Sequence, residues 1–416
     1  MVPLAMPLLL DSKNVFAYLA QAGLWEASLV CDRLERQPGK NFNLRIKGGS
    51  YDLLIKQETH GPNQKASGEL AKEWWFYQLL REQSAEISEI EEMRSRIVWP
   101  LHFDAENSVL VFPFLNNVRD LSSFYSKFCR EAGKSLSLGN QLPVSIAIAL
   151  GETFAKLHSS TFQKQSCKDF LLQQYQRAGR RSNESKLRPD FLAGLRRLTP
   201  NAFSVIPTDA LKFFRFYQHY PDIGKAIESI NQTFEGCCVV HNDPRFANFL
   251  LHDADSFTTS NPQATIQAID WEKWTWGDPA YDLAQLVANY LKLWLKSLPV
   301  SANLSLKDTL NRATVPLLAI QPSTAALLSA YLACFPQILS YRPGFVVSVV
   351  QFTGLSLVRQ VQLYIAQKRP VGNIEMAMVQ VAKSLLCQPE AAISTVFGRS
   401  RAEMEAAAHQ AIAQPA

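Results

Sequence analysis

A polar motif between two apolar runs constrains the fold of this chain more than any other part of its sequence. The motif, His241-Asn-Asp-Pro-Arg-Phe-Ala-Asn248, follows the apolar residues 239–240 and precedes the apolar run 249–251. Short, bounded apolar runs are typical of buried strand segments. We therefore expect a tight loop between two strands, with Asp243 at its start and Asn248 at its end.

A second apolar run, 264–269, alternates with period two and ends at Asp270. A hairpin between this run and the strands around the motif would bring Asp243, Asn248 and Asp270 together. Phosphoryl transfer requires such groups, because one carboxylate orients and deprotonates the attacking hydroxyl while an amide oxygen and a second carboxylate hold Mg²⁺ against the nucleotide phosphates. We therefore predict that Asp243 is the catalytic base and that Asn248 and Asp270 are the metal ligands.

Two more motifs follow the loop in order, Ile269-Asp-Trp-Glu272 and Gly277-Asp-Pro-Ala-Tyr-Asp-Leu-Ala284. With them the chain resembles the aminoglycoside phosphotransferase and choline kinase family, relatives of the protein kinases. The resemblance implies an α+β, bilobal, protein-kinase-like fold. Its small N-lobe would hold an antiparallel sheet plus one helix, its large C-lobe would be mainly helical, and ATP and Mg²⁺ would be the cofactors.

The resemblance also suggests roles for individual residues around the loop. Arg245 occupies the place of the transfer-assisting lysine of protein kinases and would neutralise developing charge, with a solvated loop arginine as the alternative. Asp282 would brace the loop rather than touch substrate. Independently, Asp278 and Pro279 have the features of a helix N-cap and of the first helical position. We expect His241 to be structural, because Asp243 is better placed as the base.

A kinase-like fold also requires a lysine for the α and β phosphates and a glutamate that pairs with it. Residues 43–56 are predicted to form a hairpin that turns at Gly48-Gly49 and ends at Lys56. Residues 69–80 have helical periodicity, and Glu73 is the predicted partner of Lys56.

Each of these two side chains also has a plain structural interpretation. Lys56 could be a solvated lysine at a strand end, and Glu73 could belong to a surface network of i, i+4 pairs. Glu69 is the alternative partner for the lysine. Their occurrence together with the catalytic motifs favours the paired arrangement.

Two other stretches are expected to contact the nucleotide. Residues 34–43 stand where a phosphate-covering loop belongs, but Gly39 is their only glycine, so a repeated backbone nest is not expected. The sequence Gly39-Lys-Asn-Phe42 resembles the family's pattern at this place and makes Asn41 a nucleotide-binding candidate. Lys40 could touch a phosphate, although loop lysines are usually solvated.

Residues 108–115 are predicted to form a buried strand that runs into a hinge, with Pro113 breaking the ladder. The backbone around Phe112 and Phe114 would then hydrogen-bond adenine. This hinge sets the predicted domains, an N-lobe at 1–111, a C-lobe at 112–398 and a tail at 399–416.

Composition bounds the class of protein. A chain of 416 residues with 47% hydrophobic content exceeds one compact core and is typical of a globular protein with two lobes. Residues 1–10 lack the charged head of a secretory signal, and no uninterrupted apolar run approaches a membrane span. Seven cysteines without a Cys-x-x-Cys pair favour reduced thiols. We therefore expect a cytoplasmic protein without a membrane partner.

The segment 164–197 is rich in lysine and arginine. In the resembled family this region contributes to the acceptor site, so its charge favours a neutral or anionic acceptor, with a solvated helical face as the alternative. A nucleic-acid partner is not expected, because the net charge of +5 is modest. Trp271, Trp274 and Trp276 could form an aromatic wall for a choline-like cation, but core packing is favoured for Trp271.

The residues together predict an ATP- and Mg²⁺-dependent phosphotransferase that moves the γ-phosphate to an alcohol hydroxyl of a small molecule. One alternative is a kinase that phosphorylates Ser or Thr of a peptide during peptide maturation. Another is a nucleotide-binding scaffold without catalysis. The sequence leaves open the acceptor, the choice of ATP or GTP, and the oligomeric state.

Overall fold

The chain divides into two compact units, the first comprising residues 1–118 and 267–274 and the second residues 119–266 and 275–416. The segment with Asp270 thus groups with the N-terminal residues, although it follows them by about 150 positions in the chain. The computed structural model describes residues 7–26, 28–59, 66–84, 92–133, 136, 141–179, 187–195, 206–257, 263–299, 308–309 and 312–406.

The first unit is built on an antiparallel sheet with the strand order β1-β2-β3-β5-β4. Gly48 pairs with Tyr51 across β2 and β3, so the hairpin turns at residues 49–50, one position later than predicted. Gly49 has φ +54°, a left-handed conformation that glycine adopts without strain. The strands are β1 Arg33–Gln37, β2 Phe42–Gly48, β3 Tyr51–Gln57, β4 His102–Asp104 and β5 Val109–Pro113.

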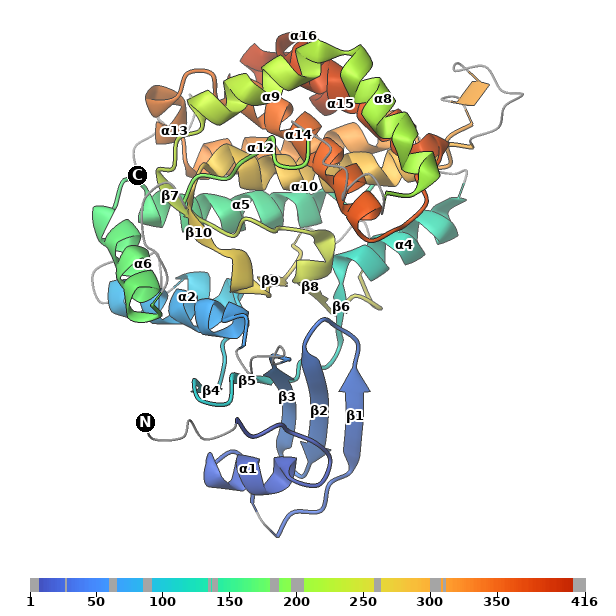
Figure 1. The fold of residues 1–416 in the computed structure, drawn as a ribbon. Coiled ribbons are helices and arrows are strands. Elements are labelled where there is room, and N and C mark those ends of the chain that lie inside the picture. Colours follow the sequence, from blue (N-terminus) through green and yellow to red (C-terminus); the bar gives the residue numbers. More distant parts are fainter. Residues whose placement is uncertain are drawn as a thin grey trace. The chain divides into compact units, whose positions relative to one another are not determined.

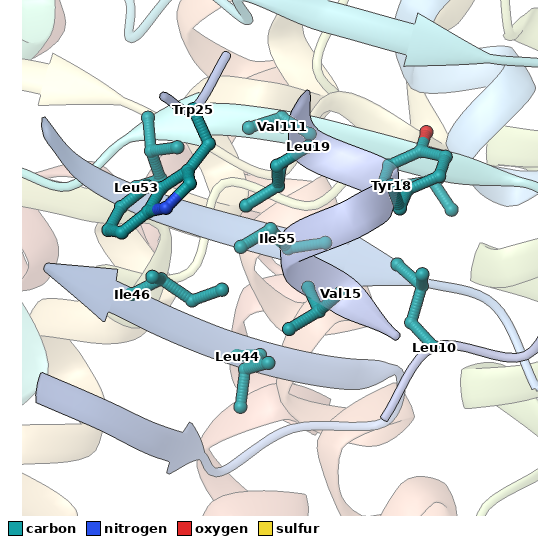
Figure 2. Packing of buried hydrophobic residues seen from close by; sticks show 11 residues of the cluster. Leu10, Val15, Tyr18, Leu19, Trp25, Leu44, Ile46, Leu53, Ile55 and Val111 are labelled. Atoms are coloured by element: carbon teal, nitrogen blue, oxygen red, sulfur yellow. The ribbon is translucent and has the colours of Figure 1, made fainter. Parts of the chain in front are cut away.

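One face of this sheet is covered by α1, Val15–Gln21, a helix that was not predicted. Figure 2 shows Val15 and Leu19 of the helix packed over alternating strand residues such as Ile46 and Ile55. All four side chains are fully buried. Because side chains alternate along a strand, Lys56 points to the opposite face from Ile55.

The long helix of the first unit is α2, Glu69–Ser84, which contains the predicted 69–80. It contacts β5, and its Tyr77 ring meets Phe112 of that strand edge to face at 6.2 Å. It also packs on the turn η6, Trp271–Lys273, where Phe76 stacks on Trp271 with ring centroids 3.9 Å apart. A further turn, η1, spans Arg94–Arg96.

The second unit is mainly helical (Figure 1). Two short strands, β7 and β10, pair antiparallel within it. The boundary strands are β6 Val118–Asp120 and β9 Ile266–Ala268. The other elements are α4 Leu121–Ala132, α5 Val144–Thr161, α6 Gln165–Arg177, η4 Thr208–Ala210, α8 Leu211–His219, α9 Pro221–Thr233, β7 Cys238–Val240, η5 Phe246–Asn248, β8 Phe249–His252, β10 Thr275–Gly277, α10 Pro279–Lys296, α12 Leu317–Cys334, α13 Gln337–Tyr341, α14 Phe345–Ala366, α15 Asn373–Cys387 and α16 Pro389–Phe397.

The core of the second unit lies among α5, α10, α12 and α14. Gly151 of α5 lets α12 approach closely, because a Cβ there would lie 2.3 Å from the Leu327 carbonyl oxygen. By length and composition, α12 and α14 are apolar enough to cross a membrane, although polar residues interrupt both helices. Half or more of each apolar window is buried within the unit, which is how core helices pack.

The predicted α+β class is confirmed, with an antiparallel-sheet unit and a mainly helical unit. The prediction of one N-lobe helix omitted α1. The boundary between the two units follows Val118. The predicted lobes, 1–111 and 112–398, stay a prediction. Within the predicted tail, residues 401–406 are helical.

Candidate active site

The polar loop that begins at His241 lies in the second unit, between β7 and the turn η5 that leads into β8. Two backbone hydrogen bonds tighten it, from Arg245 N to the Asp243 carbonyl oxygen at 2.8 Å and from Asn248 N to the Arg245 carbonyl oxygen at 2.8 Å. The strand β7 pairs with β10, where Gly277 is required because a Cβ would lie 2.5 Å from Val240. The strand–loop–strand arrangement expected from the apolar runs is therefore present.

A buried carboxylate holds the start of the loop. Asp282, in the first turn of α10, accepts hydrogen bonds from the backbone N–H groups of His241 at 2.7 Å and Asn242 at 2.8 Å. Asn242 has φ +65°, a conformation that asparagine tolerates better than most residues. His158 lies 3.4 Å from the same carboxylate and 3.1 Å from the Tyr331 hydroxyl, so its position is structural.

Asp243 follows these two amides and is 9% exposed. Its Oδ1 lies 3.0 Å from Nε of Arg245, so a cation adjoins the candidate base. Asn248 donates through Nδ2 to the Asp243 carbonyl oxygen at 2.9 Å, which leaves its side-chain oxygen to act as an acceptor. Asn289 of α10 donates to the Pro244 carbonyl oxygen at 2.9 Å and anchors the middle of the loop.

The start of α10 carries an ion pair that the sequence did not indicate. Asp278 caps the helix by accepting from the Ala280 N–H at 3.0 Å, as expected. Its other oxygen also accepts from the Arg342 guanidinium. Burial raises the pKa of the Asp278 carboxyl, and Arg342 acts in the opposite direction. Asp278 therefore links α10 to the turn before α14 as well as capping the helix.

The second set of candidate residues lies in the first unit. Lys56 Nζ donates to Asp270 Oδ1 at 2.8 Å and lies 3.5 Å from Glu73 Oε2. Glu73 is fully buried, whereas the Asp270 side chain is 33% exposed. Asp270 has φ +67° and ψ +54°, so the chain turns sharply at this carboxylate before η6. Glu69, the alternative partner, pairs instead with Lys40.

This cluster shifts the pKa of both ends of the ion pair. Burial opposes the charged form of Lys56, but the charges of Glu73 and Asp270 outweigh it and raise the pKa of the lysine. Burial raises the pKa of Glu73 to about 7, although Lys56 acts to lower it. The lysine is therefore cationic at neutral pH, with Asp270 as its close carboxylate partner.

The expected nucleotide contacts also lie in the first unit. The Phe112 ring lies 5.1 Å from Lys56 Nζ, and the residue is buried in β5. Phe114 donates its backbone N–H to the Asp52 carbonyl oxygen at 2.7 Å, so that N–H already has an acceptor. Asn41 lies half-buried in the turn between β1 and β2.

The three tryptophans pack into cores. Trp271 and Trp274 are fully buried, and the Trp274 indole N–H donates to the Lys72 carbonyl oxygen at 2.7 Å. Trp276 donates to the Gly236 carbonyl oxygen at 2.8 Å. These contacts give all three rings a packing role, as favoured for Trp271.

Much of the basic segment 164–197 lies outside the described residues, namely Arg180, Arg181, Lys186, Arg196 and Arg197. Among the described part, Lys168 lies in α6, and Arg188 donates to the Phe234 carbonyl oxygen at 2.8 Å. Arg188 therefore has a structural contact.

The braced loop of the helical unit and the lysine–carboxylate cluster of the sheet unit hold the residues that the sequence analysis assigned to phosphoryl transfer. Residues 100–302 match the family described as phosphotransferase enzyme family, a span that holds all three motifs. The predicted resemblance to the aminoglycoside phosphotransferase and choline kinase family is therefore confirmed.

Solved structures of similar chains include a choline/ethanolamine kinase family protein from Mesorhizobium loti, at 16% identity and TM-score 0.44, covering 93% of this chain and 99% of that one. A choline kinase from Streptococcus pneumoniae has 14% identity and TM-score 0.44, with coverages of 90% and 98%. A Plasmodium vivax ethanolamine kinase has 12% identity and TM-score 0.49, with coverages of 92% and 91%. The search of curated proteins found no match.

Proposed function

We propose that this protein transfers the γ-phosphate of ATP to an alcohol hydroxyl of a small molecule in a Mg²⁺-dependent reaction. The observation that carries the proposal is Asp243, held next to Arg245 on a loop whose first two amides are bound by Asp282. The loop lies within the span that matches the phosphotransferase family. A shielded carboxylate next to a cation suits a base that accepts a proton while negative charge develops nearby.

In this proposal Asp243 orients the acceptor hydroxyl and takes its proton as the hydroxyl oxygen attacks the γ-phosphorus. The bond from that phosphorus to the bridging oxygen breaks, and ADP leaves with the electron pair. Arg245 offsets the negative charge beside the transferred group. Lys56 binds the α and β phosphates, and Glu73 holds the lysine in place. Phe112, Phe114 and Asn41 would contact the rest of the nucleotide.

Asn248 and Asp270 are proposed as the Mg²⁺ ligands. Both supply hard oxygen atoms, which Mg²⁺ prefers. The Asn248 amide fits because its nitrogen is hydrogen-bonded to the Asp243 carbonyl oxygen, so the side-chain oxygen is the remaining polar atom. The ion, when bound, neutralises charge on the phosphates.

Nucleotide turnover by the purified protein, with and without alcohol acceptors, tests this function. Asp243→Asn removes the base while keeping the size of the side chain, so kcat should fall by about 10²- to 10⁴-fold. The affinity for ATP should change little, because Lys56 and the other proposed phosphate contacts are unaltered. An unchanged kcat would exclude Asp243 as the base.

The two alternatives have distinct outcomes in the same assay. A peptide kinase would incorporate phosphate into Ser or Thr of peptides and into no small alcohol. A nucleotide-binding scaffold would bind ATP without turnover, and Asp243→Asn would then have no kinetic effect. We infer a cytoplasmic location, where ATP is available, and no nucleic-acid or membrane partner.

A further inference from the structure

A lysine of the second unit lies on the helix that anchors the loop of the candidate base. Lys292 is on the same face of α10 as Asn289, which anchors the loop through the Pro244 carbonyl oxygen. Lys292 Nζ donates to the Gln360 side-chain oxygen of α14 at 3.3 Å, which fixes the position of the ammonium group. Burial lowers the pKa of Lys292 to about 8, Lys296 and Arg245 act in the same direction, and Asp243 opposes them. Lys292 therefore lies on the part of α10 that contacts the loop with the candidate base.

A second cation, Arg359, stands next to Gln360 on α14. Its guanidinium lies 6.0 Å from the Phe191 ring, and Phe191 in turn meets the Tyr281 ring at 5.4 Å. Burial raises the pKa of the Tyr281 hydroxyl. The charge of Arg359 acts to lower this pKa, and the charge of Asp243 acts to raise it. These ring contacts place Arg359 close to Tyr281, in the first turn of α10.

Two buried donors in this region lack an acceptor. Arg359 Nη1 and Gln285 Nε2 are shielded from solvent and have no hydrogen-bond partner among the described residues. Gln285 lies on α10 one turn after Tyr281 and one turn before Asn289, so it shares their face of the helix. A buried donor without an acceptor is costly, which favours a ligand that supplies acceptor oxygens.

We propose that Gln285, Lys292 and Arg359 form an anion site that binds a carboxylate or phosphate group of the acceptor alcohol. The inference rests on the proposed function, because it defines the substrate class as hydroxyl compounds that carry an anionic group. Three donors, two of them cationic, would bind such a group, whereas a choline-like or polyamine acceptor would be repelled.

Binding and transfer are measured separately with four probes that share a hydroxyl group. Glycerate carries a carboxylate, glycerol 3-phosphate a phosphate, glycerol no charge and choline a positive charge. Titration of the ADP-saturated full-length protein by calorimetry should show that at least one anion binds more tightly than glycerol and choline. The comparison of glycerate with glycerol 3-phosphate shows whether the site binds a carboxylate or a phosphate more tightly.

Lys292→Met removes the charge but keeps the chain length, so it should weaken binding of the anion by about 10- to 100-fold. Arg359→Met should have an effect of similar size, and Lys292→Arg should restore part of the affinity. Lys225→Met is the matched control, because that lysine is 77% exposed and lies on α9. Circular dichroism would verify that each variant is folded.

The results separate this inference from the proposed function. Anion binding that depends on Lys292, without phosphate transfer to any probe, would support the site and contradict the kinase function. Transfer to choline or glycerol in preference to both anions would support the kinase and overturn the site. Equal losses of kcat with every acceptor in Lys292→Met would also overturn it, since the lysine would then act on the transferred phosphate.

Discussion

The two groups of candidate residues are held in place by different forces. The loop with Asp243 is fixed mainly by hydrogen bonds to backbone, from two amides to Asp282 and from Asn289 to the Pro244 carbonyl oxygen. The cluster around Lys56 is fixed by charges on side chains, with Glu73 fully buried. Backbone hydrogen bonds set where a loop runs, whereas a buried ion cluster also shifts pKa values. Substitutions in the first group should therefore displace the loop, whereas substitutions in the second group should also change pKa values.

Among substitutions of the residues that hold the two groups in place, the largest effect is expected for Asp282→Ala. It leaves the buried amides of His241 and Asn242 without their acceptor, which costs about 1–3 kcal/mol for each donor in the free energy of unfolding. A displaced loop should also lower kcat by about 100-fold or more. Chemical denaturation and steady-state kinetics measure the two quantities.

Asp222→Asn is the control for this variant, because Asp222 is a 71% exposed carboxylate on α9. If Asp282→Ala lowered neither kcat nor stability, backbone bracing would not be what positions the loop.

Lys56→Met should have the next largest effect, on nucleotide binding. The loss of a charge-assisted contact to phosphate is expected to raise the KM for ATP by about 10- to 100-fold. Asp270 and Glu73 would also lose their shared cation. A KM for ATP equal to that of the unmodified protein would remove Lys56 from the nucleotide site.

Glu73→Gln should change the pH dependence of stability. Burial raises the pKa of Glu73 from 4.5 to about 7, so between these values the folded chain binds more protons than the unfolded chain. The free energy of unfolding contributed by this residue therefore falls as pH rises through that range, by at most about 1.4 kcal/mol per pH unit. Glutamine does not titrate, so the variant should show a flatter curve in metal-free denaturation experiments from pH 5 to 7. Parallel curves for the two proteins would contradict the raised pKa.

The smallest effect is expected for Lys40→Ala. The Lys40 side chain is 66% exposed and pairs with Glu69, and exposed ion pairs contribute about 0–1 kcal/mol. The KM for ATP should change by less than about twofold. A larger increase would mean that Lys40, in the turn between β1 and β2, releases Glu69 and binds a phosphate of the nucleotide.

The features that the sequence predicted well are those with a local signal. The strands around the loop show as short apolar runs, and α2 shows as a helical period. The hairpin turn was placed one residue early, because both glycines of Gly48-Gly49 suit a turn. Only the pairing of Gly48 with Tyr51 shows that Gly48 still belongs to the strand. The helix α1 was missed because seven residues are too few for a clear period.

The features that escaped prediction depend on residues far apart in the chain. The Asp278–Arg342 pair joins positions 64 residues apart, and the Asn289–Pro244 contact joins positions 45 apart. No local pattern marks such partners. The contact of Lys292 with Gln360 was missed for the same reason, because a single lysine in an apolar helix does not reveal which residue it faces.

The grouping of residues 267–274 with the N-terminal unit has a consequence for synthesis of the chain. When the first 118 residues have left the ribosome, Phe76 still lacks the Trp271 ring and Lys56 still lacks Asp270. The sheet unit is completed only after residues 119–266, the whole first segment of the helical unit, have been translated. A fragment that ends at Val118 should therefore expose apolar surface and aggregate. We expect chaperones to bind nascent chains of that length.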